Sequence, residues 1–255
     1  MKKNILTVIL FFSCQLLFAQ STDSPLLVKQ GKDLLAQMKE EEALEKFKSA
    51  IKSDPNNYEA ACNASLMCSR IGNRQTDETK KREHFVMAKQ YAVKSLKINA
   101  TDVQSNYVMA VAMGRMALIS GAKDKVAASR DIKNYADMAL KYNPNHANAW
   151  HVLGKWNYEV SNLNFAERAI ANSLLGGIPD GDINKSIECY IKAIGLDANN
   201  ILFYLDLAKA YHNNESDDKA IETLKKTFAL RPIVKDDANY LDQCKKLLDE
   251  IQMQK

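Results

Sequence analysis

The sequence predicts an all-α fold in which a pair of helices is repeated about five times. The chain of 255 residues contains only 9 glycines and 5 prolines, and alternating strand-like runs are hard to find in it. A pattern of small, aromatic, small and proline residues returns along the chain; the first and last units keep a length of 34 residues, and the middle units are longer. A hydrophobic content of 46% is enough to bury a core. Helix pairs repeated at such a period stack into a solenoid.

The second helix of each unit has a characteristic end. In the first unit, EEALEKFKSAIKSDPNN, the recurring positions hold Ala43, Phe47, Ala50 and Pro55. The last unit, DKAIETLKKTFALRP, has Ala220 and Pro232 at the first and last of these positions, and MAKQYAVKSLKINATD, NYADMALKYNPNH and SIECYIKAIGLDANN lie between them. Small residues allow two helices to approach closely, and a proline just beyond a helix end stops it.

The first helix of each unit is clearest in the fourth unit. There Trp150, Leu153 and Gly154 form the W-x-x-L-G opening, so the chain resembles the tetratricopeptide repeat (TPR). In such a unit the glycine lies where the helices touch, while the large side chains fill the gaps between them. We predict units near residues 24–57, 58–102, 103–146, 147–200 and 201–234, followed by a capping helix at 235–253.

The fourth unit contains the largest addition, from Val160 to Gly181. The segment SNLNFAERAIANSLL has apolar residues at helical spacing and is followed by glycines and a Pro-Asp-Gly turn. We expect a short extra helix here, acting either as a strut or as a binding surface.

Residues 26 to 252 carry a narrower resemblance, which is sharpest from residue 144 onward. The run WHVLGKWNYEVSNL, the stretch CYIKA and the ending RPIVKDD are similar to the regulator of microtubule dynamics family. This resemblance implies a helical TPR-like domain, and it implies association with microtubules and organelle membranes, as for the animal members.

The first residues have the layout of a secretory signal peptide. Lys2 and Lys3 precede an apolar run that ends at Ala19, so we predict a leader at residues 1–19 and a periplasmic or secreted mature chain. The run of about 14 residues is shorter than the roughly 20 that span a bilayer, so we expect no stable membrane span in the mature chain. Two alternatives stay open: an uncleaved leader that anchors the chain, and a lipid anchor on Cys14.

No residue pattern indicates catalysis, a metal or a cofactor. The four histidines contain no pair spaced for a metal, the remaining cysteines form no C-x-x-C, and no glycine loop of the phosphate-binding kind is present. The formal net charge is only +4, which gives no reason to expect nucleic acid as a partner. We therefore predict a protein that is not an enzyme and needs no cofactor.

The remaining candidate site is the concave groove that the first helices of TPR units line. Cationic and aromatic side chains alternate along it, at Lys32, Arg70, Tyr107, Arg115, His151, Lys155, Tyr158, Lys209 and His212. Such a surface suits a protein or peptide with acidic side chains or a free C-terminal carboxylate. We therefore predict an adaptor that holds a partner in this groove. The alternatives are a structural component that self-associates, and a microtubule-associated protein if the leader is not an export signal.

Overall fold

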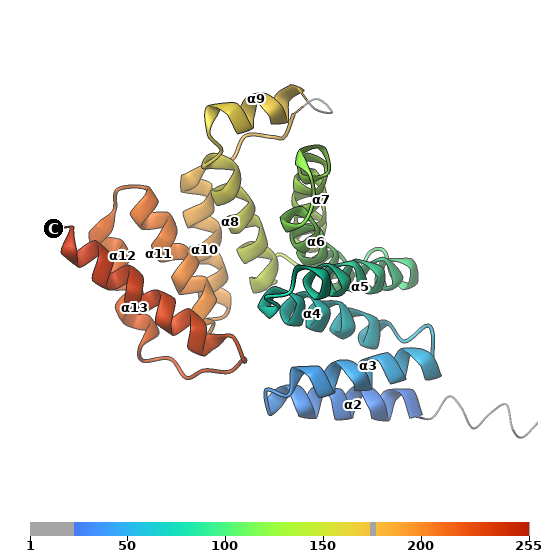
Figure 1. The fold of residues 1–255 in the computed structure, drawn as a ribbon. Coiled ribbons are helices and arrows are strands. Elements are labelled where there is room, and N and C mark those ends of the chain that lie inside the picture. The colour runs from blue at the N-terminus through green and yellow to red at the C-terminus, as the bar shows by residue number, and fades with distance from the viewer. Residues whose placement is uncertain (1–22, 174–176, 255) are drawn as a thin grey trace, which may run out of the picture.

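The computed structural model describes residues 23–173 and 177–254, and within them the chain forms twelve α-helices (Figure 1). The predictions on residues 1–19 and on Cys14 lie outside the described residues. No helix in the described ranges has the length and apolar character needed to cross a membrane. The all-α prediction is confirmed.

The helices pack in consecutive antiparallel pairs, and neighbouring pairs stack on each other. The pairs are α2 (Asp23–Ala36) with α3 (Glu40–Ser53), α4 (Tyr58–Arg74) with α5 (Glu78–Ile98), α6 (Val103–Leu118) with α7 (Ala122–Tyr142), α8 (Ala147–Ser161) with α10 (Ile183–Leu196), and α11 (Ile201–Asn213) with α12 (Asp217–Thr227). The last helix, α13 (Asp237–Met253), packs on α11 and α12 at the end of the stack. The short helix α9 (Phe165–Ser173) interrupts the fourth pair.

Polar residues in the turns begin several of the helices. The side chains of Asn57, Asp102 and His146 each accept a hydrogen bond from a backbone N–H in the first turn of the helix that follows. These side chains satisfy donors that a helix start otherwise leaves unpaired. The turns that hold Pro55 and Pro144 follow the ends of α3 and α7. The polar turn after each second helix therefore ends one unit and begins the next.

Each first helix has a small buried residue near its middle. These residues are Gly31, Ser65, Ala110, Gly154 and Ala208. A Cβ atom added to Gly154 would lie 2.9 Å from the ring of Tyr190 and 3.2 Å from the Cβ of Cys189. The serine of the partner helix, Ser186, donates a hydrogen bond of 2.8 Å to the carbonyl of Gly154. The two backbones thus approach closely because position 154 has no side chain.

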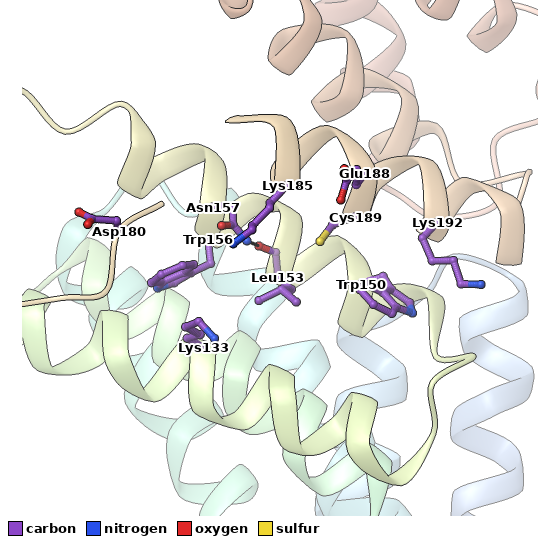
Figure 2. Close-up of a pocket in the computed structure, with 10 residues that line it drawn as sticks. All are labelled: Lys133, Trp150, Leu153, Trp156, Asn157, Asp180, Lys185, Glu188, Cys189 and Lys192. Carbon is purple, nitrogen blue, oxygen red and sulfur yellow. Dashed lines mark hydrogen bonds between the residues drawn. The ribbon is translucent and has the colours of Figure 1, made fainter. Parts of the chain in front are cut away.

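The other residues of the predicted repeat signature fall into two groups. Those at the helix contacts are buried, namely Ala43, Phe47, Ala50 and Ala220. Pro55 and Pro232 lie exposed in turns. Leu153 and Trp150 are only partly buried, because they border a pocket of about 490 Å³ between α7, α8, α10 and the segment after α9 (Figure 2). We call this the outer pocket. Trp156, by contrast, is 4% exposed.

The close approach at Gly154 leads to a stability prediction. Gly154→Ala should lower the free energy of unfolding by about 1 to 3 kcal/mol, because the added methyl group overpacks the contact with Tyr190. Gly114→Ala on α6 is the matched control, since its Cβ would meet nothing nearer than Ile132 Cδ1 at 4.0 Å. That variant should gain about 0.5 to 1 kcal/mol from helix propensity. Urea unfolding of both variants measures the contrast, and equal effects would contradict this packing.

Candidate functional site on the inner face

The first helices α4, α6, α8 and α11 lie next to one another in that order. The predicted groove residues lie on these helices, apart from Lys32 on α2. We call the side of the stack that carries them the inner face. The structure divides them into two clusters and places Lys32 and His212 outside both.

The first cluster surrounds Asp206 on α11, which is 5% exposed. His151 Nε2 lies 2.9 Å from Asp206 Oδ2, and the imidazole stacks on Phe203 with ring centroids 4.8 Å apart. Lys155 Nζ lies 3.8 Å from one carboxylate oxygen, and Lys209 Nζ lies 3.9 Å from the other. Three of the predicted groove residues therefore compensate one buried carboxylate.

The charge of Asp206 is maintained by these neighbours. Burial alone would raise the pKa of Asp206, but Lys155, the hydrogen bond from His151 and the charge of Lys209 together lower it to about 2. The carboxylate is therefore ionised at neutral pH, where it offsets the positive charge of the lysines. Tyr158 is half-buried beside this cluster, and burial raises its pKa, with a further contribution from Glu159.

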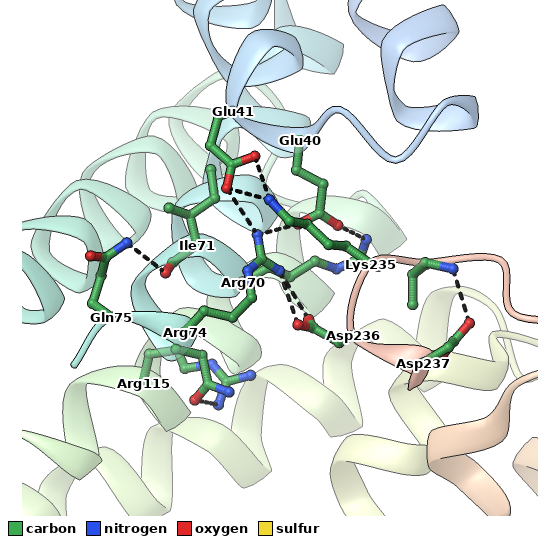
Figure 3. A network of polar contacts seen from close by, with 12 residues as sticks. Glu40, Glu41, Arg70, Ile71, Arg74, Gln75, Arg115, Lys235, Asp236 and Asp237 are labelled. Carbon is green, nitrogen blue, oxygen red and sulfur yellow. Dashed lines mark hydrogen bonds and ion pairs between the residues drawn. The ribbon is translucent and has the colours of Figure 1, made fainter. Parts of the chain in front are cut away.

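The second cluster joins the two ends of the helical stack. Arg74 at the end of α4 donates from Nη2 to Glu40 at 2.6 Å and from Nη1 to both carboxylate oxygens of Asp236 at 3.0 and 3.1 Å (Figure 3). Lys235 Nζ contacts Glu41 at 2.8 Å. We call these five residues the clasp. They hold the segment before α13 against the start of α3, although the paired residues are up to 194 positions apart in the sequence.

Arg70 also contributes to this cluster, because its Nη1 lies 3.1 Å from Glu40. Glu40 is 2% exposed, so its carboxylate lies almost entirely out of water between two guanidinium groups. A buried carboxylate of this kind needs both hydrogen bonds and charge compensation.

Arg115 on α6 has a different environment from the other predicted cations. Its Nη1 donates a hydrogen bond of 2.9 Å to Asn73, whereas its Nε is buried without a hydrogen-bond partner. Within the described residues no carboxylate lies within 4.0 Å of its guanidinium group. Burial lowers the pKa of Arg115, and Tyr240, Tyr107 and Asp236 offset part of this effect. Arg115 is a half-buried cation without a paired anion.

Two tyrosines near Arg115 complete this part of the inner face. Tyr107 is tilted against His146 with ring centroids 5.0 Å apart, and burial raises its pKa while Arg70 and Arg115 oppose the rise. Burial and Asp236 raise the pKa of Tyr240 to about 12, against the effect of Arg115. Both phenols therefore stay neutral at neutral pH and can donate hydrogen bonds to an anion.

The last two predicted residues are paired elsewhere. Lys32 forms an ion pair with Glu59, and His212 Nδ1 lies 2.6 Å from Asp217. The predicted excess of positive charge on the inner face is therefore smaller than the sequence implied, because most of the cations have an acidic partner. Periodicity identified the cations but missed Glu40, Asp206 and Asp236. The one available signal was Asp206, a lone acid in the apolar helix ILFYLDLAKAY.

Metal binding and cysteine chemistry are two alternatives to a binding role. The described residues contain no group of three or more His, Cys, Asp or Glu side chains that could hold a metal ion. The four cysteines in the described part of the chain are buried and unbridged, and burial raises the pKa of Cys68 and Cys189 to about 12. These cysteines are thus packed thiols rather than thiolate nucleophiles.

The paired helices and their inner face define a TPR-type helical-repeat protein. A solved TPR protein of Thermus thermophilus superposes with a TM-score of 0.64 and 15% sequence identity, covering 86% of this chain and 98% of that one. At this identity the likeness shows the fold, and it confirms the TPR prediction.

Within that class, the chain belongs to the family described as regulator of microtubule dynamics protein 1-3, whose model matches residues 27–252. Regulator of microtubule dynamics protein 1 of Caenorhabditis elegans is 22% identical over 72% of this chain and 80% of its own length. The human protein of that name is 26% identical over 58% of this chain, and the match spans 54% of it. The family resemblance is confirmed. The chain matches only about half the length of the human relative.

The charges around Asp206 predict how stability depends on pH. The pKa of Asp206 is about 2 in the folded state and about 3.8 in the unfolded chain, so its ionised form favours folding at neutral pH. This contribution of about 2 kcal/mol is present above pH 4 and lost as the pH falls toward 2. Wild type should therefore be more stable than Asp206→Asn at pH 7, with a difference that shrinks toward pH 2. Urea unfolding at pH 7, 4 and 2 measures this difference, and a constant value would contradict the role of the cluster.

Proposed function

We propose that this protein is a non-enzymatic adaptor that binds an acidic segment of a partner protein on its inner face. The observation that carries the proposal is Arg115, a half-buried guanidinium group with no carboxylate partner in the described part of the chain. A carboxylate from a partner would compensate the positive charge of this guanidinium group.

The surroundings of Arg115 favour an anion over a neutral ligand. Arg70 adds a second positive charge, and the neutral phenols of Tyr107 and Tyr240 supply further hydrogen-bond donors. The nearby carboxylate of Asp236 is held by Arg74 in two hydrogen bonds. A planar guanidinium group between such donors fits an aspartate, a glutamate or a free C-terminal carboxylate.

Self-association through the helix inserted after Val160 is the alternative function. The exposure of Phe165 on α9, at 90%, supports it. This residue lies on the inserted helix rather than on the inner face, so the two kinds of binding do not exclude each other.

We also propose that residues 1–19 are removed as a secretory signal peptide, with the sequence itself as support. The alternative follows from the names of the relatives, which concern microtubule dynamics. If the leader is not removed and the protein stays in a cell that contains microtubules, it is a candidate to bind microtubules. Mass spectrometry of the protein isolated from its own cells decides between these proposals. A first residue at Gln20 supports export, whereas an intact leader together with co-sedimentation with microtubules would overturn it.

The inner-face proposal is tested with peptides selected on the purified protein from a library displayed with free C-termini. We expect acidic sequences, and we expect Arg115→Met to weaken their binding at least about tenfold, because a charged hydrogen bond contributes about 1.5 to 3 kcal/mol. Fluorescence anisotropy measures the affinity. The matched control is Arg82→Met, which removes an exposed arginine on α5 that donates a 3.3 Å hydrogen bond to the carbonyl of Ile119.

Arg115→Met should remain folded, because removing a cation that lacks a carboxylate partner leaves no buried anion behind. Its melting temperature verifies this point. Equal binding by both variants would eliminate Arg115 as the anchor, and a selection that enriches no acidic peptide would refute the inner-face function.

A further inference from the structure

The outer pocket lies between the second helices α7 and α10 and is also lined by α8 (Figure 2). Trp150 and Trp156, the two tryptophans of the chain, both line it. Its volume of about 490 Å³ is enough to receive a large side chain together with part of its backbone.

The walls of the outer pocket are held in place by short contacts. A Cβ atom on Gly181 would come within 2.5 Å of the backbone nitrogen of Ser161, so the segment after α9 packs directly on the end of α8. The amide of Asp182 donates to Asn157 Oδ1 at 3.3 Å, and Arg130 Nε donates to the carbonyl of Gly177 at 2.6 Å. The pocket is thus a formed feature of the fold.

Both indole N–H groups are already used within the chain. Trp150 Nε1 donates to the carbonyl of Pro144 at 2.7 Å, and Trp156 Nε1 donates to the carbonyl of Ser129 at 2.8 Å. The tryptophans therefore present only ring surface to an occupant, and Trp150 presents most of it because it is the less buried of the two. Ring surface of this kind favours an aromatic or aliphatic side chain.

The rim of the outer pocket carries positive charge that is available to a partner. Lys133 pairs with Asp137, and Asp180 pairs with Arg168. Lys185 and Lys192 on α10 have no carboxylate within 4.0 Å among the described residues, and Glu188 is the acid between them. The occupant should therefore combine an apolar side chain with a nearby carboxylate.

The chain itself exposes such a pair. Phe165 at the start of α9 is 90% exposed, and the exposed Glu167 follows two residues later, where its carboxylate also accepts a 3.0 Å hydrogen bond from the backbone N–H of Asn164. Helix α9 stands away from the rest of the stack in Figure 1 and precedes the segment that borders the pocket. The donor and the pocket are therefore close to each other on one side of the molecule, as a two-fold dimer requires.

We propose that two copies of this protein associate by inserting Phe165 of each copy into the outer pocket of the other, which brings the first turn of α9, with the negative charge of Glu167, toward the rim that carries Lys185 and Lys192. This surface is separate from the inner face, so the dimer goes beyond the proposed adaptor function and neither depends on the other. The insertion would bury the most exposed large apolar side chain in the described part of the chain.

The test measures mass and tryptophan fluorescence together over a range of protein concentration from about 1 to about 500 µM, where weak dimers form. Because both tryptophans line the outer pocket, their emission reports on its occupation. We expect the mass from light scattering to rise from monomer to dimer and the emission to shift to shorter wavelength in parallel. Phe165→Ser should raise the dissociation constant about 10- to 100-fold.

Phe228→Ser is the matched control, since Phe228 at the end of α12 is 48% exposed and far from the pocket in sequence. It should leave the dimer intact. A second test removes the charge but keeps the helix cap: Glu167→Gln should weaken the dimer, because its amide oxygen can still accept the hydrogen bond from Asn164 while the attraction to Lys185 and Lys192 is lost. A monomer at every concentration would overturn the proposal. So would a dimer that survives Phe165→Ser, or a dimer that forms without any change in emission, since contact would then lie outside the pocket.

Discussion

The clasp around Arg74 determines the arrangement of the other charges on the inner face. A stack of helix pairs is held mainly by contacts between neighbouring pairs, so the repeat packing does not by itself bring the two ends of the stack into contact. Here Arg74 binds Glu40 from the first pair and Asp236 from the segment before the last helix. These contacts therefore link the first helix pair to the segment before the last helix. Because Glu40 is 2% exposed, losing Arg74 would leave a buried carboxylate with Arg70 as its one remaining cation.

The same contacts explain why Arg115 differs from its neighbours. Asp236 and Glu40 are acids at this end of the inner face; Arg74 pairs with both of them, and Arg70 pairs with Glu40. At the other end Asp206 is shared by Lys155, Lys209 and His151. The cations are thus compensated in groups, and within the described ranges Arg115 is left near Tyr107 and Tyr240 with a hydrogen bond to Asn73 and no paired carboxylate. Local charge balance, rather than overall net charge, identifies the candidate anchor.

The helix contacts within each unit could be predicted from the sequence, whereas the ion pairs between residues far apart in the sequence could not. Each unit makes the same helix contact, so residues of the same kind recur at the positions of Gly154, Ala43 and Phe47. The fold class could therefore be obtained from the spacing within the units. The clasp could not, since its residues are separated by up to 194 positions and no periodic rule relates them. The burial of Asp206 is an intermediate case. A single acid in an apolar helix was the available signal that the prediction did not use, and only the structure shows which cations face this acid.

Two residues in this structure do not follow the rules that stabilise the rest of it. Arg115 places a charge in a half-buried site without an anion, and Phe165 places a phenylalanine in water at 90% exposure. Neither arrangement favours the isolated folded chain, and exceptions of this kind concentrate at functional sites. They also lie on different sides of the stack, Arg115 on the inner face and Phe165 on the inserted helix. A repeat protein can therefore use its inner face for one partner and its insertion for another, because the insertion leaves the helix contacts of the repeats unchanged.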